Sequence, residues 1–132
     1  MANALYDNGR DAFLKGQINW SADTFKVALL SNSYVVNLAS HQYVSSLSGI
    51  VATSSALITS TPGAGVAGAS NVTFASVTGS QITQFVIYKD TGSAATSPLV
   101  AYFDTATNLP ITPNGGSINL QWDTGSLRIF KL

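Results

Sequence analysis

The chain has 132 residues, which is the length of one domain and enough to bury a hydrophobic core. Six basic residues balance six acidic ones and cysteine is absent, which argues against nucleic-acid binding, anionic membranes, disulfides and thiolate chemistry. Charged residues make up only 9% of the chain, and a surface of neutral polar groups loses little desolvation energy when another protein covers it.

The N-terminus has neither a basic start nor an apolar core, so it does not look like a secretion signal. The sequence also contains no apolar run of the roughly 20 residues that a membrane span needs. We therefore expect the protein to stay in the cytosol in which it is made, or to leave as part of a larger assembly.

Apolar spacing predicts one N-terminal helix, over residues 2–16. The expected apolar face consists of Leu5, Gly9, Ala12 and Phe13. Asn3 is the expected N-cap and Gly16 the expected stop signal. Gly9 costs about 1 kcal/mol in a helix relative to Ala, so we expect it to admit another backbone at close range.

After Gly16 the pattern changes to short runs rich in β-branched and aromatic residues, separated by Gly, Pro, Asn and Ser. The expected strands are Thr24–Leu30, Ile50–Thr59, Asn71–Val77, Ile82–Lys89, Leu99–Asp104, Ser117–Trp122 and Leu127–Leu132. The nearly continuous apolar run of Ile82–Lys89 predicts a central strand. We expect a mainly β fold: one domain over residues 1–132, an antiparallel β-sandwich or jelly-roll-like barrel with one short N-terminal α-helix.

Two segments fall outside this strand pattern. Residues 61–65 contain Pro and Gly and indicate an exposed loop. Ser31–Leu47 is too apolar for a linker but shows no clear period, which indicates an ordered excursion with a short helix near His41–Leu47.

The motif Asp-Thr-Gly-Ser occurs twice, at Asp90–Ser93 and Asp123–Ser126. Aspartic proteases use two such segments to share a proton between carboxylates. Here the copies are too close together for two lobes, and Lys89 precedes the first. Asp-x-Gly is also ordinary turn chemistry, and that is our interpretation.

Other catalytic or metal sites find little support. A Ser-His-Asp triad would need His41, the only histidine, and one histidine without cysteine cannot supply a usual zinc ligand set. Asp104 and Asn108 could hold a structural calcium ion, although one carboxylate binds calcium weakly. We expect no catalytic residue, no cofactor and no metal.

Contact residues are expected where aromatic and apolar side chains fall outside clear strands. Tyr88 and Trp122 lie in apolar strands and are expected in the core. The residues expected to contact a second subunit or a partner are Trp20, Tyr34, Val35, Val36, His41 and Tyr43.

Three stretches carry a resemblance to known proteins: MANALYDNGRDAFLKGQINW at the start, VIYKDTGSAATSPLVAYFD in the middle and LPITPNGGSINLQWDTGSLRIFKL at the end. They resemble a family of small virion structural proteins of tailed bacteriophages, most like a capsid cement or decoration protein. The resemblance covers most of the chain and is weakest between Ser31 and Ala69. It involves whole segments and no catalytic motif.

The resemblance implies a non-enzymatic protein that binds the major capsid protein on the capsid exterior and stabilises the shell, as a homo-oligomer, most typically a trimer. Its place would be the virion, after assembly in the host cytoplasm. The N-terminal helix and Ser31–Leu47 are expected to make the subunit or capsid contacts. One alternative is a tail or fibre component that binds a host receptor or glycan through Trp20 or Tyr34, and another is a hydrolase that uses Asp90 with Asp123, or His41.

Overall fold

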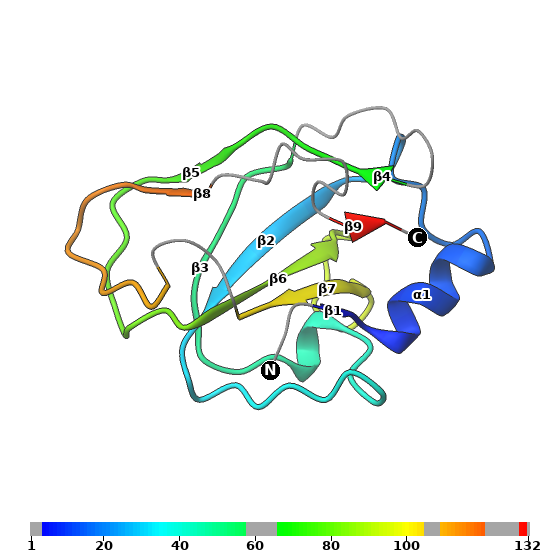
Figure 1. Cartoon of the computed structure of the whole chain (residues 1–132), viewed down its shortest axis with the longest axis horizontal. Helices are drawn as coiled ribbons and strands as arrows, with labels where there is room; N and C mark the ends of the chain where they lie inside the picture. Colours follow the sequence, from blue (N-terminus) through cyan, green and yellow to red (C-terminus); the bar gives the residue numbers. More distant parts are fainter. Residues whose placement is uncertain (1–3, 58–65, 105–108, 121–129, 132) are drawn as a thin grey trace.

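The computed structural model describes residues 4–57, 66–104, 109–120 and 130–131, and it is mainly β with one α-helix in that part of the chain (Figure 1). The elements are β1 (Ala4–Leu5), α1 (Asp7–Leu14), β2 (Phe25–Leu30), the 3-10 helix η1 (Val44–Ser46), β3 (Ile50–Thr53), β4 (Val66–Ala67), β5 (Val72–Phe74), β6 (Gln84–Lys89), β7 (Leu99–Phe103), β8 (Ile118–Leu120) and β9 (Phe130–Lys131). The predicted fold class is confirmed.

The main sheet has five strands in the order β1-β7-β6-β2-β3, and every neighbouring pair is antiparallel. Two smaller antiparallel pairs, β4–β9 and β5–β8, form the other layer (Figure 1). The prediction of a central strand is confirmed, because β6 lies between β2 and β7 and is buried from Gln84 to Tyr88. The C-terminal segment is also paired as predicted, through β9.

Both faces of the main sheet are covered, because side chains alternate across each strand. The large core lies between the sheet and the smaller strand pairs, and its fully or nearly fully buried members include Phe25, Val27, Leu29, Phe85 and Ile87. The small core lies on the opposite face, and it consists of Tyr6, Ala28, Leu30, Tyr34, Val44, Val86, Tyr88, Leu99 and Tyr102. Burial on two faces explains why β6 has no polar–apolar alternation in the sequence.

The predicted helix is shorter than expected at its start. Residues 4 and 5 are extended because they pair with Tyr102 and Ala101 of β7, so the helix begins at Asp7 with Tyr6 as its N-cap. The prediction of Asn3 as N-cap is therefore wrong, and Leu5 is not on the helical face. The predicted end is confirmed: Gly16 has a φ of 74°, and its N–H donates to Phe13 O at 3.2 Å.

Gly9 lets the helix backbone reach β7, as predicted. A Cβ added to Gly9 would lie 2.7 Å from Leu99 O and 3.0 Å from Val100 O. At this point β7 has a bulge, since Ile87 pairs with Ala101 and Tyr88 pairs with Leu99, which leaves Val100 as the extra residue. The bulge in β7 and the missing side chain of Gly9 together let the backbone of α1 pack directly against β7 (Figure 1).

Two short strands were not predicted, and several predicted features, among them the core position of Trp122, fall outside the described residues. β1 and β4 have two residues each, which is too short for any periodicity. The predicted loop 61–65 and the second Asp-Thr-Gly-Ser segment are not described. Within the described part of the chain, no helix is both long and apolar enough to cross a membrane.

We expect Gly9→Ala to destabilise the protein by about 1–3 kcal/mol, because the new methyl group meets backbone oxygens that cannot move without shifting β7. Helix propensity alone predicts the opposite sign, because Ala in place of Gly stabilises a helix by about 1 kcal/mol. Urea unfolding measures the change. Leu14→Ala is the control, since Leu14 is 88% exposed, and equal or higher stability of the Gly9 variant would contradict the assignment.

Candidate functional site

The predicted excursion is an ordered cover on one face of the main sheet, and we define it as the 31–49 segment. Its ends meet where Ser31 N–H donates to Gly49 O at 2.9 Å. The 3-10 helix Val44–Ser46 confirms the short helix predicted nearby. The amide of Asp7 at the start of α1 donates to Leu38 O at 2.9 Å, so the segment also contacts the helix.

Gln84 of β6 attaches the start of this segment to the sheet. Its side-chain amide donates to Ser31 O and to Tyr34 O, both at 2.8 Å, and its carbonyl oxygen accepts from the Tyr102 hydroxyl. Gln84 is only 6% exposed. All of its bonds stay inside the protein, and a buried amide with satisfied bonds stabilises one backbone arrangement over its alternatives.

A second polar anchor runs from the core to the surface through Tyr6, Tyr34 and His41. The hydroxyls of Tyr6 and Tyr34 lie 2.7 Å apart, and the Tyr34 hydroxyl lies 2.7 Å from His41 Nδ1. The backbone N–H of Asn37 donates to the same Nδ1 at 3.3 Å, so Nδ1 is an acceptor. With Nδ1 as the acceptor, Tyr34 donates to His41 and accepts from Tyr6.

Burial changes the ionisation of these tyrosines. It raises the pKa of Tyr6 far above the usual value of 10.0, and the hydrogen bond to Tyr34 adds to the effect. Burial likewise raises the pKa of Tyr34, and it raises the pKa of Tyr102 to about 12, with a contribution from the negative charge of Asp104. The hydroxyls thus stay neutral donors across the physiological range.

Two of the six expected contact residues are buried within the chain. Trp20 is 5% exposed; its ring packs on Phe25 at 4.5 Å between centroids, and its Nε1 donates to Gly68 O at 3.0 Å. Tyr34 is 3% exposed and belongs to the small core. The prediction that these two form a contact surface is therefore wrong. The sequence placed them outside strands, but both complete a core through partners distant in sequence.

The other four expected contact residues come together on the 31–49 segment. Val35 is 79% exposed, whereas Val36, His41 and Tyr43 are half-buried. Their role in contacts stays a prediction, and Val35 is the most exposed large apolar side chain of this segment.

Asp90 forms a turn, which confirms the interpretation of the first Asp-Thr-Gly-Ser motif. Its Oδ1 accepts from Gly92 N–H at 3.0 Å and Gly92 has a φ of 89°, while Oδ2 lies 3.0 Å from Lys26 Nζ. The Gly92 amide, followed by Lys26, lowers the pKa of Asp90 below its usual value. The second motif, with Asp123, lies outside the described residues.

In the described part of the chain, no three His, Cys, Asp or Glu side chains come together in a way that could hold a metal ion. Asp104 lies at the end of β7, but Asn108, its expected companion in a calcium site, is outside that part.

A feature that the sequence analysis missed is the separation of charge along the chain. Residues 27–88 contain no Asp, Glu, Lys or Arg. This stretch includes the 31–49 segment, which contacts the start of α1, and β3 and β5, which lie away from α1 (Figure 1). The ion pairs Asp7–Arg10, Asp11–Lys15, Asp23–Lys89 and Lys26–Asp90 lie on α1 and near the neighbouring ends of β2 and β6. Only a count along the chain was needed to detect the uncharged stretch.

Comparison with known proteins does not identify a relative. No protein-family model matches the chain, and no curated protein matches it significantly.

We expect Tyr34→Phe to lower the free energy of unfolding by about 1–3 kcal/mol, because it leaves Tyr6 OH and His41 Nδ1 without their shared partner. The control is Tyr43→Phe, whose hydroxyl accepts an exposed hydrogen bond from the Gln42 side chain. Urea unfolding of both variants measures the difference. Equal stability of the two would show that the chain of hydroxyls does not anchor the segment.

Alkaline pH should destabilise the protein through Tyr6. Its folded-state pKa is raised above 10.0, so the stability it contributes is complete below pH 10 and declines as the pH rises further. One such tyrosine lowers the free energy of unfolding by up to about 1.4 kcal/mol per pH unit. We expect Tyr6→Phe to have a shallower decline than the wild type in urea unfolding between pH 9 and about pH 11.5; parallel curves would contradict this.

Proposed function

We propose that this protein is a non-enzymatic structural component of a tailed-phage virion, which binds the outer capsid surface as a homo-oligomer, with a trimer as the specific expectation. The resemblance of three segments to small virion proteins supports the class. The structural observation that carries the contact surface is the uncharged 31–49 segment, with Val35 79% exposed on it.

An uncharged surface suits a protein that is covered in its working state. Ser, Asn and Gln side chains dominate the exposed positions of the 31–49 segment, and neutral polar groups lose less on desolvation than charged ones. An exposed valine gains apolar burial when a partner covers it. Together these properties favour a protein that binds another protein surface over one that acts alone in solution.

The anchoring of the segment supports the same proposal. Gln84 and the Tyr6–Tyr34–His41 chain hold its backbone to the sheet before any partner binds. A preordered contact surface loses less conformational entropy on binding than a loop that has to order. This arrangement therefore presents Val35 in a defined position.

The N-terminal helix cannot be tested by deletion, although the sequence predicted contacts for it. Removing residues 2–16 would also remove Tyr6 from the small core and Gly9 from its contact with β7. The exposed residue Leu14, at 88%, is the position on the helix at which a contact can be tested without disturbing the fold.

The central test compares Val35→Asp with Leu14→Asp in co-sedimentation with empty capsids built from the phage's own major capsid protein. Both side chains are highly exposed, so neither change should affect folding. We expect the wild type to sediment with capsids and Val35→Asp to bind at least about tenfold more weakly. Light scattering of the free protein gives its mass, for which we expect three chains.

Two results would contradict the proposal. If the wild type ignores capsids, the protein belongs elsewhere in the virion, with a tail component as the first alternative. If capsid binding is retained by Val35→Asp and lost by Leu14→Asp, the contact surface lies on α1 and not on the 31–49 segment.

A further inference from the structure

The dipeptide Asn-Gly occurs twice in the chain, as Asn8-Gly9 and as Asn114-Gly115. This dipeptide is chemically labile, because the main-chain nitrogen after an asparagine can attack the side-chain amide and glycine has no side chain to obstruct the attack. The attack requires a backbone that brings the nitrogen to about 3–3.5 Å from Cγ of the asparagine. The fold gives the two pairs different geometries.

The first pair is held in a geometry that opposes the attack. Asn8 lies in the first turn of α1, where the side chain projects from the helix surface while the next nitrogen stays inside the backbone cylinder. The Asn8 side-chain amide also donates to His41 O at 3.5 Å. Gly9 has no room to move towards the side chain, because its backbone already lies against Leu99 O of β7.

The second pair lies in an exposed turn before β8, where residues 114–117 are exposed. Asn114 Oδ1 accepts from Gly116 N–H at 2.9 Å, which folds the side chain back over the peptide bond between Asn114 and Gly115. Gly115 has a φ of 86°, a conformation that favours glycine. The ring closed by this hydrogen bond contains both Cγ of Asn114 and the nitrogen of Gly115, so it keeps the two reacting atoms close together.

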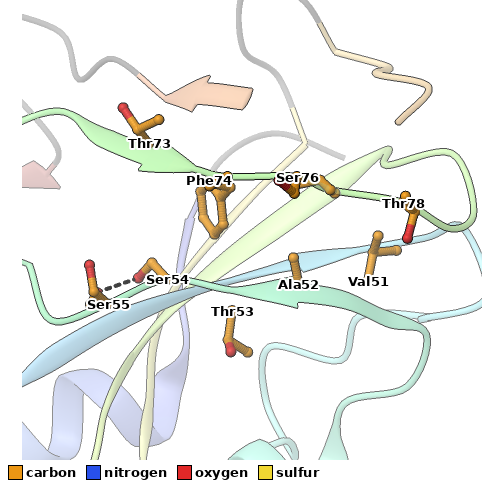
Figure 2. A pocket seen from close by; sticks show the side chains of 11 residues that line it. Val51, Ala52, Thr53, Ser54, Ser55, Thr73, Phe74, Ser76 and Thr78 are labelled. Carbon is orange, nitrogen blue, oxygen red and sulfur yellow. Dashed lines mark hydrogen bonds between the residues drawn. The ribbon is translucent and has the colours of Figure 1, made fainter. Parts of the chain in front are cut away.

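The same hydrogen bond stabilises the charge that the attack creates. Attack at Cγ moves negative charge onto Oδ1, and Gly116 N–H already donates to that atom. Space is available as well, since the nearest side-chain atom, Thr78 Cγ2, lies 4.0 Å from the position that a Cβ on Gly115 would take. Figure 2 shows Thr78 past the end of β5.

One hydrogen bond must open before the reaction. Gly115 N–H donates to Val77 O at 2.8 Å, and the nitrogen attacks only after its proton is lost to solvent base. This bond belongs to an exposed turn, where local opening costs much less than global unfolding. Ring closure at Asn8 would instead require α1 to separate from β7.

We propose that Asn114 is a site of spontaneous covalent modification in the folded protein and that Asn8 is protected. The Gly115 nitrogen bonds to Cγ of Asn114, the Cγ–Nδ2 bond breaks, and the amide group leaves as ammonia with the proton that the Gly115 nitrogen has lost. Water then opens the resulting succinimide at one of its two carbonyl carbons, which yields aspartate or isoaspartate. The inference is independent of the proposed capsid function.

Either product changes this part of the molecule. Residues 109–120 contain no Asp, Glu, Lys or Arg, so the new carboxylate is the first charge among them. Isoaspartate also lengthens the main chain by one carbon atom, which shifts Gly115 and Gly116 relative to Val77, their hydrogen-bond partner. This turn leads into β8, which pairs with β5 over the large core.

The test is a slow incubation of the folded protein at about pH 9, where solvent base is available, followed by tryptic digestion and mass spectrometry. Cleavage after Arg and Lys places Asn8 in Met1–Arg10 and Asn114 in Asp90–Arg128, and a sample digested without incubation gives the background. We expect Asn114 to be modified at least about tenfold faster than Asn8. The formal net charge of the chain is +0, so the intact modified protein separates by anion exchange.

Two controls distinguish the fold from the dipeptide itself. In urea that unfolds the chain, the two asparagines should react at similar rates, because the turn and the helix are both lost. Asn114→Gln should abolish the new anion-exchange species, since its longer side chain closes a ring more slowly, and Asn8→Gln should leave that species unchanged. The proposal fails if Asn8 reacts as fast as Asn114 in the folded protein, if neither reacts there, or if the same preference persists in urea.

Discussion

The two-sided burial of β6 is the constraint on which the rest of the structure depends. Residues 84–88 are buried, so their main-chain groups must be satisfied by β2 on one side and β7 on the other. The same alternation sends Phe85 and Ile87 into the large core and Val86 and Tyr88 into the small core. The smaller strand pairs cover one face of the sheet and the 31–49 segment covers the other. Together they shield β6 and its neighbouring strands from water.

Polar anchors decide how the second cover is held. Hydrophobic contact alone would leave the 31–49 segment free to shift over a smooth face, since such contact is not directional. Gln84 lies in the buried central strand β6 and bonds to the turn at Ser31 and Tyr34, while His41 ends the chain of hydroxyls at the surface. The segment thus has one preferred position, and that position is what a contact surface requires.

Charged side chains are unevenly distributed along the chain, since residues 27–88 contain no Asp, Glu, Lys or Arg. Ion pairs on α1 and near the adjacent strand ends keep that region solvated, whereas the 31–49 segment, β3 and β5 present hydroxyl and amide groups. The proposed contact surface, the 31–49 segment, lies in this uncharged stretch. It presents the side chain of Val35, which is 79% exposed.

The sequence by itself determined the fold class, the central strand and the role of Gly9, because these follow from local periodicity and from the absence of a Cβ. Tertiary structure decided the rest. Residues 4 and 5 became a strand because β7 offered them a ladder, and Trp20 and Tyr34 became core residues through partners 48 and 28 positions away, Gly68 and Tyr6. Pairing between distant segments is set by the packing of the whole chain, and no local pattern encodes it.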